Sequence, residues 1–470
     1  MSDTDVPVFD ITTAVSLDGR RFQLVGTVGS AAEPGRFVTL QAADVKQLGQ
    51  VNAVHYEIGS ALHAEGTLLG VISEDGRHLD SRRSHPFAAA AVEDASAETI
   101  ELIYGSTGST VQIGSYLASG GTPARLLPHR FNRHTFWCGQ SGSGKTYALG
   151  VVLEQLLLRT ALPMVIFDPN ADFVNIREPS TGNEDSAATR MLSERDIRIL
   201  RPSSPAKSSL RVRFVDLQMR ARAAVLRLDP LADHAEYNEL VHLEETVGTL
   251  NPEEVVPQIL KRGTPAAHAL AARIENLRVT NWSVWAAGRE AVTDVLDARP
   301  DATVLDLGGF TYPDESLVVT MAVLDDLWAK REQKRPILIV IDEAHNLCSP
   351  DQTSPLHVAV RERIIQIAAE GRKFGLWLLL STQRPSRIHP SIISQCDNLA
   401  LMKMTSPVDL DELGTIFGFV PPALLSRSPQ FKQGEALFAG GFVPAPAIVK
   451  MGGRLTREGG SDVSVPMRTP

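Results

Sequence analysis

The stretch that decides the fold is GQSGSGKT, at residues 139–146. It follows a short apolar run, TFWC at 135–138, and precedes a helical pattern at 145–160. Glycines in such a loop let backbone N–H groups converge on phosphate oxygens, and the following helix adds the positive end of its dipole. A glycine-rich turn without a ligand is the alternative, but the full pattern between a strand and a helix favours a phosphate-binding loop. The sequence therefore predicts a nucleotide site here.

The residues of this loop are expected to share the work of binding ATP. Lys145 is predicted to contact the β- and γ-phosphates, and Thr146 to ligate Mg²⁺. The other predicted nucleotide contacts are Gly139, Gln140, Ser141, Gly142, Ser143 and Gly144. ATP and Mg²⁺ are thus the expected cofactors.

Two carboxylates, Asp342 and Glu343, follow the apolar run ILIVI at 337–341. If that run is a parallel strand, both lie at the carboxyl edge of the sheet, where ligands bind in such folds. Asp342 then suits the Mg²⁺ shell, and Glu343 suits the general base that orients and polarises the attacking water. Alone, such a pair equally fits a charge complement to a helix N-terminus. Together with the phosphate-binding loop, the catalytic interpretation is favoured.

Two further apolar runs end in polar residues at the same expected edge. The run MVIF at 164–167 ends in Asp168, and LWLLLS at 376–381 leads to Gln383. We expect Asp168 to be a site residue, whereas Asp172, in the following DPNAD segment, is assigned to a turn. Gln383 is placed where a polar side chain could sense the γ-phosphate. An ordinary polar residue at a strand end is the alternative for Gln383.

The letters DEAH at 342–345 resemble the motif of DEAH-box helicases, but the spacing from the phosphate-binding loop does not support that class. His345 is therefore given no role. Arg372 lies at the end of the helical pattern 356–374 and could complement the dipole of its own helix. We favour the alternative, an arginine finger that reaches the ATP of a neighbouring subunit.

The amino-acid composition limits the classes of protein to which the chain can belong. The 470 residues have 43% hydrophobic and 21% charged residues, as globular chains do. The three cysteines show no metal-ligand spacing, and we find neither a signal peptide nor a membrane-spanning run, so a cytoplasmic protein without a membrane partner is expected. A net charge of −9 does not indicate nucleic-acid binding. It does not exclude it, because a ring can confine its basic groups to a channel.

The chain divides into a β-rich part and an α/β part. Short Val/Ile/Leu/Thr-rich runs separated by glycines predict a small all-β module at the N-terminus. From about residue 120, continuous apolar runs alternate with helical patterns, as buried parallel strands require. One segment rich in Ala, Leu, Glu and Arg interrupts this part and is predicted to be helical. The predicted divisions are 1–118 for the β module, 119–205 and 301–451 for the α/β core, 206–300 for the helical insertion and 452–470 for a C-terminal arm.

Several separate segments together resemble the HerA-like ATPases of the HerA/FtsK branch of P-loop motors. They are FNRHTFWCGQSGSGKT (131–146), VIFDPNADF (165–173), LIVIDEAHNLC (338–348), AAEGRKFGLWLLLSTQRPSRIHPSIISQCDN (368–398) and GEALFAGG (434–441). The pair EGRKFG and STQRPS is the most specific, because generic P-loop proteins do not combine them. The resemblance covers nearly the whole chain.

This resemblance implies an N-terminal β-barrel, a RecA-like core interrupted by a helical bundle, and a C-terminal arm that braces a neighbour. It also implies a homo-hexameric ring that translocates along double-stranded DNA, with a nuclease of the NurA type as partner. Carried over to this sequence, Lys145, Thr146, Asp168, Asp342, Glu343 and Gln383 would line the nucleotide site. Arg372 would act in trans, and Arg133 matches a family arginine near the subunit interface.

Two departures from the family pattern limit this transfer. Asp172 stands where a glutamate is expected, and the helical insertion is only modestly basic. Candidates for DNA phosphate contacts are Lys261, Arg262, Arg273 and Arg278, for which a solvated helix face is the alternative.

Two functions therefore stay open. The first is an ATP-driven DNA translocase in repair, end resection or genome processing. The second is a nucleotide-gated ring scaffold that recruits an effector nuclease or other enzyme, for example in phage defence.

Overall fold

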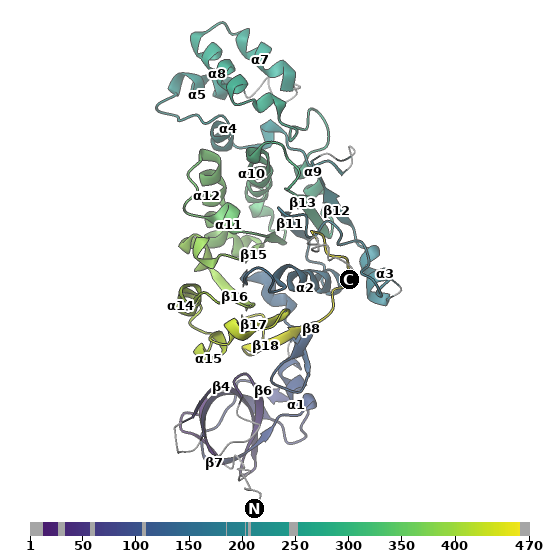
Figure 1. Cartoon of the computed structure of the whole chain (residues 1–470), viewed down its shortest axis with the longest axis vertical. Coiled ribbons are helices and arrows are strands. Elements are labelled where there is room, and N and C mark those ends of the chain that lie inside the picture. Colours follow the sequence, from purple (N-terminus) through teal and green to yellow (C-terminus); the bar gives the residue numbers. More distant parts are fainter. Residues whose placement is uncertain are drawn as a thin grey trace, which may run out of the picture. The chain divides into compact units, whose positions relative to one another are not determined.

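The computed structural model describes residues 13–26, 33–56, 62–105, 110–184, 186–202, 204, 208–243 and 252–460 (Figure 1). Its contacts divide the chain into two compact units. The first comprises Met1–Phe131, Trp137–Arg159 and Asp397–Gly453, and the second comprises Asn132–Phe136, Thr160–Cys396 and Arg454–Pro470. Among the described residues, no helix has both the length and the hydrophobicity needed to cross a bilayer.

The N-terminal part of the first unit is a closed antiparallel barrel. Its strands are β1 (Thr13–Ser16), β2 (Arg21–Gly26), β3 (Phe37–Ala42), β4 (Val45–Tyr56), β5 (Leu62–Ile72) and β7 (Phe87–Asp94), with the short β6 (Leu79–Asp80) beside β5. They follow the order β2-β1-β7-β3-β4-β5, and pairing of β2 with β5 closes the ring. Phe22, Leu24 and Leu40 fill its core. A Cβ at Gly66 would lie 2.1 Å from the Phe22 ring, so only glycine leaves room for that core.

The barrel confirms the predicted β module, but the module ends earlier than expected. The last barrel strand stops at Asp94, and the predicted boundary at 118 falls between β8 (Val111–Tyr116) and β9 (Pro123–Leu126). These two strands pair with each other, and β8 also pairs with β18 (Ala447–Met451). Residues 111–126 therefore belong to the same sheet as the C-terminal strands, and alternation of apolar residues alone could not show which sheet they join.

The rest of the first unit contains the phosphate-binding loop, several strands and a few helices. The end of β10 (His134–Cys138) is followed in sheet order by β16 (Cys396–Leu401), β17 (Glu435–Gly440), β18, β8 and β9. Helix α2 (Lys145–Arg159) packs against β8. The remaining helices of this unit are α1 (Ala97–Glu101), α14 (Pro407–Ile416) and α15 (Pro422–Leu425), with 3₁₀ turns at Leu102–Tyr104, Pro128–Asn132 and Ser428–Gln430.

The second unit contains a parallel sheet. Its strands are β12 (Ile197–Leu200), β13 (Ala302–Asp306), β11 (Met164–Asp168), β14 (Ile337–Ile341) and β15 (Leu376–Thr382), in that spatial order, followed by the start of β10. Every neighbouring pair from β12 to β15 is parallel. Strands β11 and β14 are buried along their whole length, which explains their continuous apolar runs. Because the strands are parallel, β11, β14 and β15 end at one edge.

Helices cover this sheet and build a separate lobe. Outside the lobe, the described helices of this unit include α3 (Ala187–Ser193), α9 (Val292–Asp297), α10 (Pro313–Ala329), α11 (His345–Cys348), α12 (Pro355–Glu370) and α13 (Pro390–Ile393). The lobe contains α5 (His234–His242), α7 (Pro252–Leu260) and α8 (Pro265–Asn276), with α4 (Met219–Val225) beside α12 (Figure 1). Thr264 starts α8 by accepting a hydrogen bond from Ala267 N at 3.0 Å. The fold class is confirmed: an α/β P-loop core with a helical insertion and an N-terminal β-barrel.

The described part of the predicted C-terminal arm pairs with its own unit. Thr456 forms an isolated antiparallel bridge with Pro179, and Ser180 N donates to Leu455 O at 2.9 Å. Arg457 forms an ion pair with Glu178 at 2.7 Å. Residues 454–460 therefore bind the loop after β11 of the same chain.

His134 anchors β10 within the second unit. Leu378 N donates to its Nδ1 at 2.9 Å, so the proton sits on Nε2, which lies 3.0 Å from Ala368 O. Burial lowers the pKa of His134 to about 4, and the positive charges of Arg372 and Arg133 act in the same direction. The neutral ring thus links β15 to the end of α12.

This buried ring predicts a pH-dependent stability. The folded pKa lies below the unfolded value of about 6.5, so the stabilisation is complete above that pH and is lost as pH falls toward 4. Over that window wild-type protein should lose up to about 3 kcal/mol that His134→Gln does not lose. Urea denaturation of both proteins between about pH 7.5 and pH 4.5 measures this. Parallel stability profiles would contradict the assignment.

Candidate functional site

The phosphate-binding loop needs its glycines for different reasons. Gly142 and Gly144 have φ values of +75° and +84°, in the left-handed region that side chains disfavour. A Cβ at Gly139 would lie 2.7 Å from Met402 Cβ, so the neighbouring strand end excludes one. Around Gly142, by contrast, an added Cβ would meet no atom within 4 Å. The turn is thus closely packed at its base and open at its tip.

Backbone hydrogen bonds hold both ends of the loop. Gln140 N donates to Lys403 O at 2.9 Å, and Gly434 N donates to Ser143 O at 3.0 Å. The tip at 141–142 is exposed. These two bonds hold the ends of the loop, and neither of them involves residues 141–142 at its tip.

Helix α2 starts directly after the loop. Lys145 is its first residue and is only 5% exposed, and Thr146 is half-buried. A helix of 15 residues presents free N–H groups and the positive end of its dipole at this point. The open tip and the helix N-terminus fit the phosphate chain of ATP.

In the second unit, Asp168 and Asp342 end adjacent strands and are both buried. Asp168 accepts hydrogen bonds from Asp172 N at 2.9 Å and Phe173 N at 2.8 Å. Burial raises the pKa of Asp168 to about 6, although those two hydrogen bonds act to lower it. The charge of Asp342 adds to the rise. Asp342 accepts a 2.6 Å hydrogen bond from Ser381 Oγ at the end of β15. Because β11 and β14 are adjacent and parallel, these two carboxylates lie at one edge of the sheet.

Glu343 has an unusual backbone. Its φ is +45°, and the residue is buried. Gln383 Nε2 donates to Glu343 Oε1 at 2.7 Å, and His345 Nδ1 lies 3.2 Å from Glu343 Oε2. Non-glycine residues in left-handed conformations concentrate at functional sites. Glu343 and Gln383, both predicted as site residues, are thus in direct contact.

A cluster of three carboxylates that is suited to binding a cation lies at this edge of the sheet. Asp168, Asp172 and Asp342 each offer an oxygen within 4.8 Å of the others. Mg²⁺ prefers oxygen ligands, so the residues fit the ion predicted at Asp342. Asp172 makes the predicted turn contact through its N–H, and its carboxylate also joins this group.

The two predicted interface arginines lie in the second unit. Arg133 directly precedes β10, and Arg372 lies in the 3₁₀ turn Gly371–Phe374 after α12. Both are half-buried, and both act electrostatically on His134. The structure therefore brings Arg133 and Arg372 to the surroundings of one buried ring.

Two residues of this edge were missed by the sequence analysis. His345 contacts Glu343, and Asp172 joins the acidic group. Position was the available signal: His345 stands two residues after the predicted base, and Asp172 four residues after Asp168. Neither was given a role, because Asp172 was assigned to a turn and His345 was assigned to a chance match with the DEAH motif.

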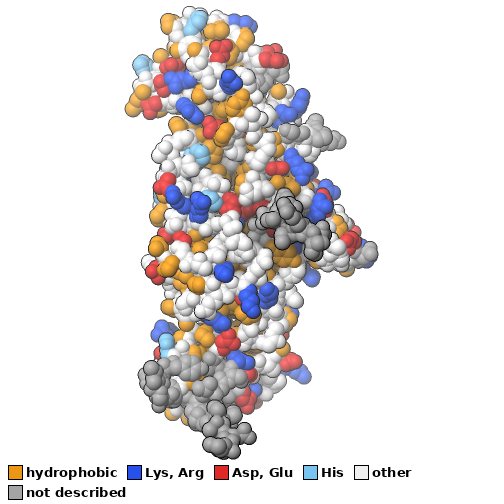
Figure 2. All heavy atoms as spheres, viewed as in Figure 1, with side chains coloured by type: hydrophobic (Ala, Val, Ile, Leu, Met, Phe, Trp, Pro, Cys, Tyr) orange, Lys and Arg blue, Asp and Glu red, His pale blue; other side chains and the backbone are white. Residues whose placement is uncertain are grey.

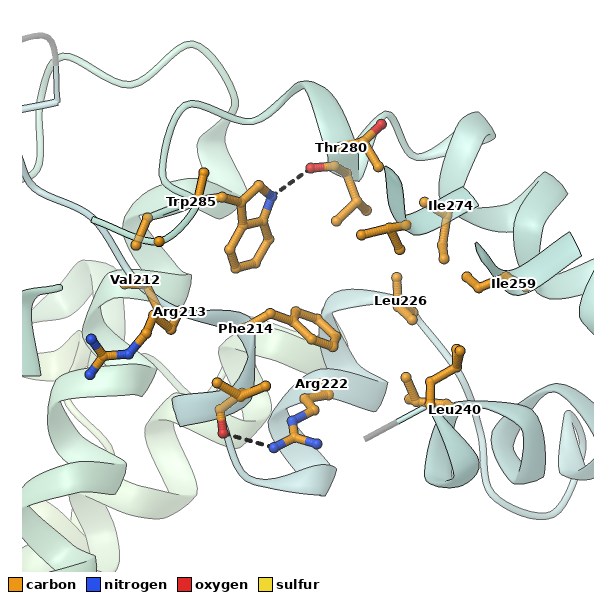
Figure 3. Close-up of a pocket in the computed structure, with 17 residues that line it drawn as sticks. Val212, Arg213, Phe214, Arg222, Leu226, Leu240, Ile259, Ile274, Thr280 and Trp285 are labelled. Carbon is orange, nitrogen blue, oxygen red and sulfur yellow. Dashed lines mark hydrogen bonds between the residues drawn. The ribbon is translucent and has the colours of Figure 1, made fainter. Parts of the chain in front are cut away.

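An apolar pocket of about 80 Å³ lies in the helical lobe (Figure 3). Phe214, Leu226, Leu240, Ile259 and Trp285 line it. Trp285 Nε1 donates to Val279 O at 2.7 Å. None of the predicted site residues lines this pocket, so it belongs to the packing of the lobe.

Some of the candidate DNA-contacting residues in the lobe already form ion pairs with acidic residues. Arg273 pairs with Asp233 at 2.8 Å, and Arg262 pairs with Glu239 at 2.5 Å. On the face that Figure 2 draws, acidic and basic side chains are interspersed over the lobe. This face therefore shows no broad basic surface.

Comparison with known proteins agrees with this architecture. Residues 111–323 match the family model described as the central domain of helicase HerA. The DNA double-strand break repair helicase HerA of Pyrococcus furiosus is 22% identical, over 87% of this chain and 80% of that protein. The HerA helicase of Sulfurisphaera tokodaii is 24% identical, over 89% and 88%.

Among solved structures, a bacterial conjugative coupling protein, TrwBΔN70, aligns with a TM-score of 0.49 at 15% identity. That alignment covers 76% of this chain and 92% of the other. The identification rests on the sequence matches, the phosphate-binding loop and the carboxylates at the sheet edge. They show that residues 111–323 form an ATPase domain of the HerA central-domain type, in a chain that is similar to HerA helicases over most of its length.

Proposed function

We propose that this chain is a ring-forming motor that uses ATP hydrolysis to move along double-stranded DNA, in repair, end resection or genome processing. The observation that carries the hydrolytic part is the 2.7 Å contact of Gln383 with Glu343, beside the fixed Asp342. This contact supports the proposal that Glu343 is the general base and Gln383 the γ-phosphate sensor. The relatives named as DNA double-strand break repair helicases support DNA as the track.

The proposed mechanism assigns one task to each group. The loop 139–144 holds the phosphates through backbone N–H groups, and Lys145 neutralises charge on the β- and γ-phosphates. Thr146 and Asp342 would hold Mg²⁺, which supplies electrostatic stabilisation of the phosphates when bound. Glu343 accepts the proton of the attacking water as that water bonds to the γ-phosphorus and the bond to the bridging oxygen breaks. Asp168 supports the carboxylate edge.

The proposal includes a homo-hexameric ring. Arg372, and Arg133 beside the same histidine, would complete the ATP site of the neighbouring subunit. An arginine supplied in this way accelerates phosphoryl transfer about 10³- to 10⁵-fold in characterised cases. A nuclease of the NurA type is the proposed partner.

Replacing the base separates hydrolysis from binding. In Glu343→Gln the amide cannot accept the proton, so we expect the ATPase rate to fall at least about 100-fold while nucleotide affinity is kept. Lys145→Ala should instead weaken nucleotide binding itself. Steady-state hydrolysis and equilibrium binding of a fluorescent ATP analogue measure both quantities.

The matched control is Glu332→Gln, because the Glu332 side chain is 70% exposed outside this edge. It should hydrolyse ATP like the wild type. Full activity of Glu343→Gln would rule out the proposed mechanism.

The DNA track gives a second prediction. Double-stranded DNA should raise the ATPase rate, and the stimulation should fall with added salt because phosphate contacts release counterions. Hydrolysis assays with and without duplex DNA, from about 50 to 200 mM salt, test this. A rate that DNA leaves unchanged, together with stable binding of a nuclease, would favour the ring scaffold instead.

A further inference from the structure

We infer that His345 is a positioning residue that, together with Gln383, fixes the carboxylate of Glu343 in direction. This inference rests on the proposed role of Glu343 as the base. It adds a residue to which neither the motif at 342–345 nor the comparisons assign a task.

Each oxygen of the Glu343 carboxylate has its own side-chain neighbour. Gln383 Nε2 donates to Oε1 at 2.7 Å, and His345 Nδ1 lies 3.2 Å from Oε2. The side chains of Glu343 and His345 are 7% and 18% exposed. Two neighbours on opposite oxygens restrict rotation of the carboxylate about its last bond more than one donor could.

The ring nitrogen of His345 that lies near Glu343, Nδ1, also contacts the end of β15. The same Nδ1 lies 3.2 Å from Thr382 Oγ1, and that oxygen already accepts a hydrogen bond from Arg384 N at 3.0 Å. Nδ1 is therefore in contact with both Glu343 Oε2 and Thr382 Oγ1. The ring is held against the end of β15.

Local backbone structure explains why a residue two positions after the base can reach it. Glu343 is left-handed, and Ala344 N donates to Ser381 O at 2.8 Å, which ties the turn to β15. Helix α11 begins at His345. The turn thereby brings His345 Nδ1 to Glu343 Oε2.

Holding the carboxylate in this way does not block its chemistry. Each carboxylate oxygen has two lone-pair sites, so one remains for a water molecule after each contact. What the neighbours supply is direction, and misplacement of a reacting group costs up to about 100-fold in rate. Removing the His345 contact should therefore lower kcat and leave the KM for ATP unchanged.

The test compares three substitutions of one side chain. His345→Ala removes the donor and should lower kcat about 10- to 100-fold. His345→Asn places an amide N–H near the Nδ1 position and should recover most of that loss. His345→Gln places its amide nearer the Nε2 position and should recover less. His78→Ala, in the exposed turn between β5 and β6, is the control and should match the wild type.

A second measurement needs neither nucleotide nor turnover. In the nucleotide-free protein, the shift in Tm caused by His345→Ala is measured in the wild type and in Glu343→Ala. If the two side chains interact, the shift should be clearly smaller in the Glu343→Ala background. Tm shifts that are equal in both backgrounds, with His345→Asn as slow as His345→Ala, would overturn the inference.

The outcomes also separate this inference from the proposed function. If Glu343→Gln stops hydrolysis but His345→Ala keeps the wild-type kcat, the positioning role is wrong and the base remains. If Glu343→Gln hydrolyses ATP normally, the proposed base is wrong, and only the Tm comparison then reports on the His345 contact.

Discussion

The chemistry of this protein depends on how the end of β15 is aligned with the turn after β14. Three consecutive residues at the end of β15 and just after it contact residues that follow β14: Ser381 donates to Asp342, Thr382 lies beside His345, and Gln383 donates to Glu343. A backbone bond from Ala344 N to Ser381 O fixes the alignment. A shift of one residue along either segment would turn these side chains away from one another. The parallel pairing of β14 with β15 therefore brings Asp342 and Glu343 into contact with Ser381 and Gln383.

The same sheet sets the electrostatics of that group. Strands buried on both faces end in acidic residues, so Asp168 and Asp342 sit where water is scarce. Burial of the carboxylate raises the pKa of Asp168, and the charge of Asp342 adds a smaller rise. Backbone N–H groups and a hydroxyl offset part of this cost. A cation bound among these oxygens would offset the rest, so the edge is suited to binding a metal with phosphate.

Much of the fold was predictable because its signals are local. The phosphate-binding loop, the apolar runs of the buried strands and the Ala- and Leu-rich insertion each depend on residues close together in the chain. The boundary at 118 was not predictable, because β8 could have joined either the barrel or the core sheet by its own sequence. Its partner β18 lies more than 300 residues away, and pairing at that range leaves no periodicity in either strand.

The residues of the candidate site likewise divide into those that local sequence could predict and those that it could not. Lys145, Asp342 and Glu343 could be proposed because a loop motif and a strand end each define a position in space. Gln383 could be placed at the sheet edge, but its contact with Glu343 depends on the alignment of two strands. His345 and Asp172 were set aside because one-dimensional patterns gave each a sufficient ordinary explanation. Their contacts arise only from a left-handed turn at Glu343 and an Asx-type turn at Asp168, which bring nearby residues back onto the carboxylates. Residues that such turns bring back onto a carboxylate are the ones that motif spacing alone overlooks.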